Sequence, residues 1–172
     1  MVTKKKGAGA LTVTMPSDRE VVMTRVFDAP RRLVFEAWTK PEHVVHFLGP
    51  YGSTMVECEI DLRAGGTYRY VIRHRGKDTG MRGVYREIVR PERLVVVEGF
   101  DDFPDQESFI TATFTEEDGQ TTLTSHILYA SVEARDAVVH MGMADGAGQM
   151  FDRLAEHLRT MLRPQPTNPA SP

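Results

Sequence analysis

The sequence has little of what would place it outside the ordinary soluble single-domain proteins. It holds one cysteine, Cys58, so an internal disulfide is excluded and a reducing compartment is expected. No apolar run approaches the roughly 18 residues of a membrane span; the longest β-rich run, residues 94–100, has the length of a strand. Positive charge is not in excess, because the net charge is −3, which argues against a nucleic-acid partner. We therefore expect a cytoplasmic protein without nucleic-acid or membrane partners.

Both ends lack the pattern of a folded core. Residues 1–10 are rich in lysine, glycine and alanine, and their basic cluster is not followed by an apolar stretch long enough for a secretory signal. Residues 163–172 contain four prolines and no apolar periodicity. A chain of 172 residues fits one domain. We expect one domain over residues 11–162 between two flexible tails.

Alternating apolar and polar residues predict a succession of strands. Over residues 53–63, Val56, Cys58 and Ile60 share one face, and acidic residues occupy the other. The other predicted strands span residues 19–27, 67–74, 81–89, 92–100, 108–116 and 121–130. Consecutive strands that are joined by tight turns pair in the antiparallel sense. The pattern therefore predicts an α+β protein with an antiparallel sheet.

Helical spacing of apolar residues follows the first strand and the last strand. Residues 28–40 predict one helix, with Asp28 as its N-cap, and Pro41 opens a second, shorter one. After the last strand, Ser131 is expected to cap a further short helix. Apolar residues then recur at steps of three and four over residues 143–161, which predicts a long helix.

Three glycines interrupt the start of the long helix. Gly142 is expected to end the preceding short helix, because glycine is favoured just past a helix end. Gly146 and Gly148 lie inside the long helix, where each glycine costs about 1 kcal/mol relative to alanine. They either let the helix approach the sheet closely or leave space uncovered, and both interpretations stay open.

Four segments occur in the order that one protein family shows: RVFDAPRRLVFEAWTKPEHV, IDLRAGGTYRY, GVYREIVRPERLV and GMADGAGQMFDRLAEHL. Over about residues 19–162 the chain resembles the family of activators of the heat-shock-protein-90 ATPase, within the SRPBCC (START-like, helix-grip) superfamily. The resemblance implies a curved antiparallel sheet of six to seven strands around a long C-terminal helix, with two short helices after the first strand. It also implies a hydrophobic cavity between helix and sheet. Phe47 departs from the tryptophan of many relatives, so their cavity shape is not carried over.

A set of aromatic and methionine residues could converge between the sheet and the long helix. On the residues alone they form a core; the resemblance favours a cavity that binds a hydrophobic or aromatic small molecule without a cofactor. The candidate lining residues are Trp38, Phe47, Tyr68, Tyr70, Ile72, Tyr85, Phe100, Phe109, Thr111, His126, Met143, Ala147, Met150 and Phe151. The polar anchors among them would be Tyr68, Tyr70, Tyr85 and His126.

His126 and Glu98 are weak candidates for acid–base catalysis. If its strand face lines the cavity, His126 could orient a polar ligand or transfer a proton. Glu98 shares its strand face with apolar residues, so we expect it to point inward and to need a partner or a shifted pKa. The expected partners are Arg69, Arg82 or Arg86. A cyclase/dehydratase enzyme is therefore one alternative function, and a co-chaperone that acts on a heat-shock chaperone ATPase is another.

Metal and nucleophile chemistry are not indicated. His43 and His46 are spaced to share a helix face, but no third ligand lies near them in the sequence, so no metal is expected. Cys58 is expected to be a small buried hydrophobe, because nothing nearby would stabilise a thiolate. A homodimer through a sheet edge or a helix surface is compatible with the sequence, although no heptad run demands one.

Overall fold

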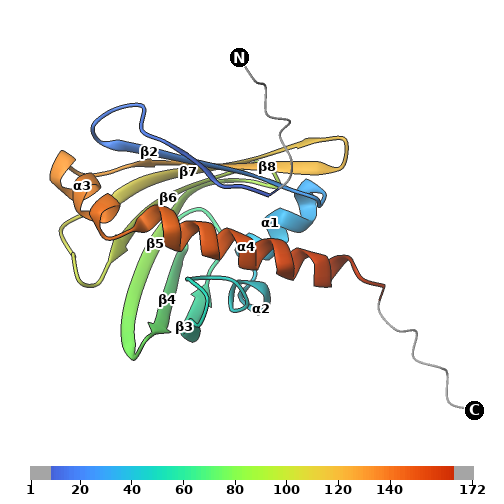
Figure 1. Cartoon of the computed structure of the whole chain (residues 1–172), viewed down its shortest axis with the longest axis horizontal. Helices are drawn as coiled ribbons and strands as arrows, with labels where there is room; N and C mark the ends of the chain where they lie inside the picture. The colour runs from blue at the N-terminus through green and yellow to red at the C-terminus, as the bar shows by residue number, and fades with distance from the viewer. Residues whose placement is uncertain (1–8, 165–172) are drawn as a thin grey trace, which may run out of the picture.

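The computed structural model describes residues 9–164, and within them the strands form one antiparallel sheet that curves around the last helix (Figure 1). The order across the sheet is β1-β2-β8-β7-β6-β5-β4-β3. The strands are β1 (Thr12–Thr14), β2 (Glu20–Phe27), β3 (Thr54–Ile60), β4 (Thr67–His74), β5 (Lys77–Val89), β6 (Arg93–Phe100), β7 (Ser108–Glu117) and β8 (Gln120–Leu128). Chain neighbours from β3 to β8 pair directly, which confirms the predicted succession of antiparallel strands. Residues 1–8 of the tail predicted at residues 1–10, and residues 165–172 of the tail predicted at residues 163–172, lie outside the described residues.

The eight strands exceed the six to seven expected, and β1 accounts for the difference. It pairs with β2 over three residues, from Thr12 opposite Thr24 to Thr14 opposite Val22. A strand this short carries too few residues for an alternating pattern to show. A second difference lies in β3, where a bulge falls between Met55 and Glu57. The bulge turns Val56 outward, so it is exposed and does not share the face of Cys58 as the alternation predicted.

The helices lie at the predicted places. They are α1 (Arg31–Thr39), α2 (Pro41–Val44), α3 (Val132–His140) and α4 (Met143–Leu162). Ser131 caps α3 by accepting the backbone N–H of Ala134 at 3.0 Å, and Gly142 adopts a left-handed φ of 83° between α3 and α4. Both predictions are confirmed. Within the described chain, no helix is both long and apolar enough to cross a membrane.

The predicted N-cap of α1 is wrong. Asp28 accepts a hydrogen bond from the Gln120 side chain, while Pro30 occupies the N-cap position without a side-chain bond. The free N–H of Arg31 instead donates to Glu116 Oε2 of β7 at 2.7 Å. A carboxylate from a distant strand therefore provides the cap that the local sequence was expected to provide.

The core lies between the concave face of the sheet, α1 and the second half of α4. The inward residues of β2 alternate strictly, and the ring of Phe27 meets that of Phe151 at 6.2 Å. Phe35 of α1 meets Phe114 of β7 edge-on at 5.3 Å. Apolar side chains at this end of α4 are almost completely removed from water, which is the main term that stabilises such a fold.

Candidate functional site

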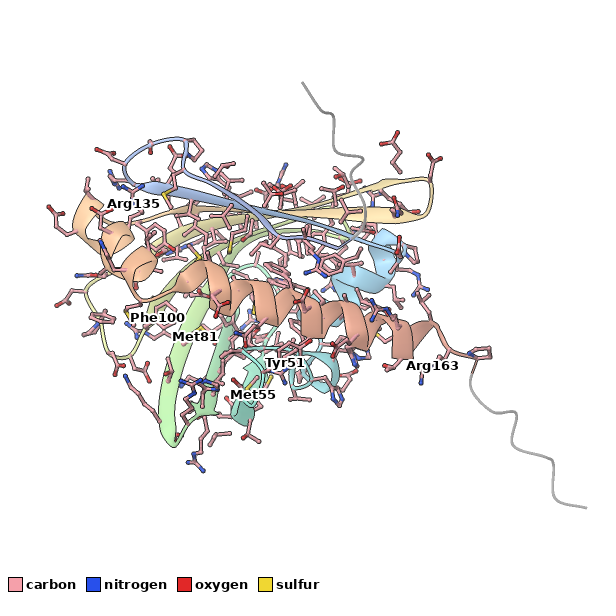
Figure 2. All side chains as sticks on the ribbon, viewed as in Figure 1. Tyr51, Met55, Met81, Phe100, Arg135 and Arg163 are labelled. Carbon is pink, nitrogen blue, oxygen red and sulfur yellow. The ribbon has the colours of Figure 1, made fainter. Side chains whose placement is uncertain are left out.

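Helix α4 is packed unevenly along its length. Its second half buries Phe151, Leu154 and Leu158 almost completely. Its first half, residues 143–150, buries no residue fully, although Met143, Ala147 and Met150 pack against the core. Figure 2 shows Met81 of β5 and Phe100 of β6 below these first turns, and both are also only partly buried. Apolar side chains that face the interior therefore remain in reach of water here.

Four tyrosines gather on the concave sheet face at this end of the molecule. They are Tyr68 and Tyr70 of β4, Tyr85 of β5 and Tyr129 just after β8, and all are buried. The rings of Tyr68 and Tyr70 stack with centroids 4.9 Å apart, and Tyr85 tilts against Tyr68 at 5.3 Å. The three tyrosines named from β4 and β5 thus contact one another in the structure.

Glu98 points inward, and its partner is a tyrosine. Strand pairing sets Tyr68 opposite Gly83, and Gly83 opposite Glu98, in one row across three strands. The Tyr68 hydroxyl donates to Glu98 Oε2 at 2.5 Å. To reach it, the ring lies over Gly83, where an added Cβ would stand 2.1 Å from Tyr68 Cζ. Glycine is required at this strand position so that the ring can cross.

The expected arginine partners of Glu98 lie elsewhere. Arg69 and Arg82 reach the opposite side of the sheet, where both bind Asp101, and the Arg69 nitrogens contact it at 2.6 and 2.7 Å. Arg86 is exposed. The expectation of an ion pair is therefore wrong, because strand alternation sends these side chains outward while Glu98 points inward.

Burial sets the protonation of this cluster. Burial raises the pKa of Glu98, and the hydrogen bond from Tyr68 lowers it in part. Burial also raises the pKa of Tyr68 and Tyr70 well above the ordinary value, and that of Tyr129 to about 12. The phenols therefore stay protonated at neutral pH, and the carboxyl group binds a proton more readily than an exposed glutamate.

Two polar groups of the cluster stay available for further hydrogen bonds. Glu98 Oε1 and the Tyr129 hydroxyl have no partner among residues 9–164. In that range, Nε of Arg25 is the one side-chain nitrogen or oxygen that is both fully enclosed and unpaired. It follows that the free oxygen of Glu98 and the hydroxyl of Tyr129 are not sealed off from solvent.

The flank of α4 is attached to a neighbouring loop at two positions and open at a third. Arg153 donates to the carbonyls of residues 46 and 48–50 at 3.0–3.2 Å, and Gln149 accepts the backbone N–H of Tyr51 at 3.1 Å. One turn earlier, a Cβ added at Gly146 would meet nothing within 4 Å, and the same holds at Gly148. The helix glycines therefore do not pack tightly against the sheet, and a side chain at either position would enter open space.

Two surface hollows accompany this arrangement. One of about 60 Å³ lies between β2 and the second half of α4, beside Arg25 and Leu158. The other, of about 230 Å³, lies over β4, β5 and β6 and is lined by Arg69, Arg82 and Val97 among others. Neither is lined by the first half of α4. In that half, the glycines meet open space on the flanks of the helix, and the inward side chains stay partly exposed.

Three predicted lining residues lie on the opposite face of the sheet. Ser125 and Ile127 of β8 are buried, so His126 between them points outward, where it bonds to Glu20. Its cross-strand neighbour Thr111 faces the same way, and Phe109 is 46% exposed. The prediction is wrong for these residues, because each was chosen by residue type without fixing the phase of the alternation. His126 therefore cannot hold a ligand on the concave face of the sheet, and it cannot transfer a proton there.

Other predicted lining residues fill the tightly packed end. Trp38 stacks on Phe47 at 5.7 Å and on Phe151 at 5.8 Å, which joins α1, the chain after α2 and α4. Ile72 is also buried. These side chains are core contacts in this structure. Cys58 is half-buried, and burial raises the pKa of its thiol, as expected of an unreactive cysteine.

A histidine cluster joins α4 to α2. His43 Nδ1 lies 3.0 Å from His157 Nε2, and the ring of His46 stacks on that of His157 at 4.7 Å. Burial, and then the charges of the other two rings, lower the pKa of His157 to about 4. Among residues 9–164, no group of three or more histidine, cysteine or acidic side chains has the arrangement of a metal site. The spacing of His43 and His46 gave no sign of His157, which is over a hundred residues away.

The eight-stranded curved sheet with a long C-terminal helix against its concave face defines a helix-grip α+β protein. A family model described as Activator of Hsp90 ATPase homolog 1-like protein matches residues 28–159. The chain belongs to this family. A search of curated proteins finds no match.

Solved structures of bacterial proteins share the fold. A Rhodobacter sphaeroides protein is 27% identical, with a TM-score of 0.80 over 88% of this chain and 99% of its own. A Mycobacterium smegmatis protein is 26% identical, with a TM-score of 0.76 over 90% of this chain and 98% of its own. An Arthrobacter aurescens protein, at 17% identity and a TM-score of 0.77 over 93% and 98%, shows the fold alone.

Proposed function

We propose that this protein binds an apolar small molecule between the first half of α4 and the concave face of the sheet. The observation that carries the proposal is the contrast along α4. Its second half buries Phe151, Leu154 and Leu158, whereas Met143 and Met150 of its first half and Met81 and Phe100 of the sheet stay partly exposed. Small-molecule sites are mostly apolar with a few fixed polar groups, which describes this region.

The methionines supply the adaptability that such a site needs. Methionine is unbranched and flexible, so it adopts a new rotamer at little cost when a ligand arrives. Neither surface hollow extends beneath the first half of α4, and we expect Met143 and Met150 to move aside as the ligand enters. Gly146 and Gly148 leave open space on the flanks of the helix for this rearrangement.

Titration with the fluorescent apolar probe N-phenyl-1-naphthylamine tests the proposal. We expect saturable binding at one site, and we expect Ala147→Trp to weaken it by about tenfold or more, because the indole would occupy the site. Met141→Trp adds the same side chain at an exposed position just before α4 and should leave binding unchanged. Equal binding by wild type and Ala147→Trp, with both folded by circular dichroism, would contradict the proposal.

Acid–base chemistry of the cyclase/dehydratase type is a second candidate, favoured by one observation. Glu98 is an inward carboxyl group with a raised pKa and one oxygen free of protein partners, which suits a general acid or base. The test is loss of a poly-β-keto thioester in the presence of protein, followed by mass spectrometry. Turnover by wild type that Glu98→Gln abolishes would support it, and equal turnover by both would remove it.

A further inference from the structure

We propose that the ligand of the binding site proposed above is an apolar amine, held by its ammonium group at Oε1 of Glu98. This proposal rests on the proposed function, since it names the chemical class of the molecule bound at the same place. The evidence is the composition of the cluster around Glu98: a carboxyl group with one free oxygen, ringed by tyrosines, with no cation beside it.

The first step is the missing positive charge. Within residues 9–164, no lysine, arginine or histidine side chain pairs with Glu98, whose one bonded partner is the neutral Tyr68 hydroxyl. Arg25, a buried cation of the same concave face, is already paired with Asp152 at 2.6 Å. A carboxylate that has lost much of its hydration is stabilised by a positive partner, because desolvation of an isolated charge is expensive. A ligand ammonium would provide the pairing that the chain does not.

The second step is the aromatic surroundings. Three of the tyrosine rings contact one another at centroid distances of 4.9 and 5.3 Å, and all four tyrosines lie close enough to Glu98 for its charge to raise their pKa values. The electron-rich faces of aromatic rings attract ammonium groups, most strongly where water is excluded. The Tyr129 hydroxyl oxygen can accept a further ammonium hydrogen. A carboxylate ligand would meet repulsion from Glu98 instead.

The third step concerns the proton on Glu98. Burial raises the pKa of this carboxyl, so the empty protein takes up the proton at a higher pH than an exposed glutamate would. An ammonium stabilises the charged form, and binding to the protonated fraction must release that proton to solvent. Amine affinity should therefore fall as the pH is lowered through the pKa of Glu98, whereas binding of a neutral alcohol should not fall in this way.

The experiment compares three probes on one skeleton: 1-naphthylmethylamine, 1-naphthalenemethanol and 1-naphthoic acid. Each is titrated calorimetrically into the full chain near neutral pH. We expect the amine to bind about tenfold or more tightly than the alcohol, as a charge-assisted bond allows, and the acid to bind most weakly. Glu98→Gln should remove the preference for the amine and retain the alcohol. Glu20→Gln, which changes the glutamate bonded to His126 on the outer face, should leave all three affinities unchanged.

The outcomes separate this inference from the proposed function. Equal binding of the three probes by wild type overturns the amine site but leaves an apolar pocket standing. No binding of any probe overturns both. If Glu98→Gln does not fold, the affinities of the wild type for the three probes and their pH dependence decide the question. An amine preference that weakens as pH falls, with proton release seen as a dependence of the heat on buffer ionisation, supports the inference. A preference independent of pH contradicts it.

Discussion

At the scale of single residues, Arg25 is a positive charge held inside the protein by one carboxylate. It is 5% exposed, its Nη1 donates to Asp152 Oδ1 at 2.6 Å, and its guanidinium lies 5.5 Å from the centroid of the Phe27 ring. Its Nε has no partner. Asp152 is half exposed, whereas the Arg25 side chain is buried. If Asp152 were removed, water could therefore replace only part of the stabilisation that its carboxylate gives to the Arg25 guanidinium. Most of the cost of losing the pair would come from the cation that remains behind.

We expect Asp152→Ala to lower the free energy of unfolding by about 1–3 kcal/mol, because a buried charged donor loses its acceptor. The double variant Arg25→Met, Asp152→Ala should recover much of this loss, since it removes the buried charge and keeps the packing volume. Urea unfolding of the wild type, both single variants and the double variant measures the coupling. An Asp152→Ala protein as stable as wild type would mean that Arg25 is solvated after all.

Gly83 carries a second prediction at this scale. Gly83→Ala places a Cβ 2.1 Å from Tyr68 Cζ, so the ring must leave its position over the strand and its bond to Glu98. We expect a loss of about 1–3 kcal/mol from overpacking. The matched control is Gly146→Ala, where nothing lies within 4 Å and helix propensity predicts a gain of up to about 1 kcal/mol. Thermal unfolding of both variants distinguishes the two glycines, and equal effects would contradict the assignment.

At the scale of elements, the contact between α2 and α4 depends on pH. Burial and the neighbouring histidines lower the pKa of His157 to about 4, from 6.5 in the unfolded chain. Between these values the unfolded chain binds more protons than the fold, so stability falls as pH drops through this window and is complete above it. Urea unfolding at about pH 7.5, 6.5 and 5.5 measures the slope. His157→Gln should flatten it, and an unchanged slope in that variant would assign the effect to other groups.

Prediction of the elements from sequence succeeded where periodicity is long and failed where a contact is distant. The strands from β2 to β8 and helix α4 each carry enough turns or alternations to reveal the type and place of the element, and Gly142 revealed the junction before α4. The bulge in β3 broke the alternation at Val56, and the cap of α1 came from Glu116. Neither the bulge nor the cap can be predicted from the neighbouring sequence, because each depends on which strands lie beside one another in the fold.

The candidate site was predictable in composition and only partly in geometry. The inward direction of Glu98 was predictable from the strand parity that it shares with Leu94 and Val96, and Tyr68 and Tyr70 were expected to lie together. That Tyr68 reaches Glu98 required the register of three strands and the absence of a side chain at Gly83. His126 failed because choice by residue type ignored the phase of β8.

At the scale of the whole molecule, the two halves of α4 differ in packing: the second half forms part of the core, and the first half leaves apolar side chains partly exposed. Figure 1 shows α4 lying against the concave face of the sheet. The second half of α4 and the strands beneath it hold the largest fully buried side chains, and Arg153 attaches that half to the loop before β3. The cluster of Glu98 and the tyrosines lies on the same sheet face, toward the less densely packed end. The fold therefore keeps a polar group near its interior without placing it in the most densely packed region.

The left-handed Gly142 and the two uncovered glycines have a consequence for how such a chain can diverge. Substitutions at Gly146 and Gly148 meet open space, whereas substitutions at Phe151, Leu154 or Leu158 meet a filled core. New side chains can therefore accumulate at these two glycine positions without loss of the fold, because the second half bears most of the stabilising burial. A lineage with this architecture can change the shape of what it recognises while the scaffold that presents it stays the same.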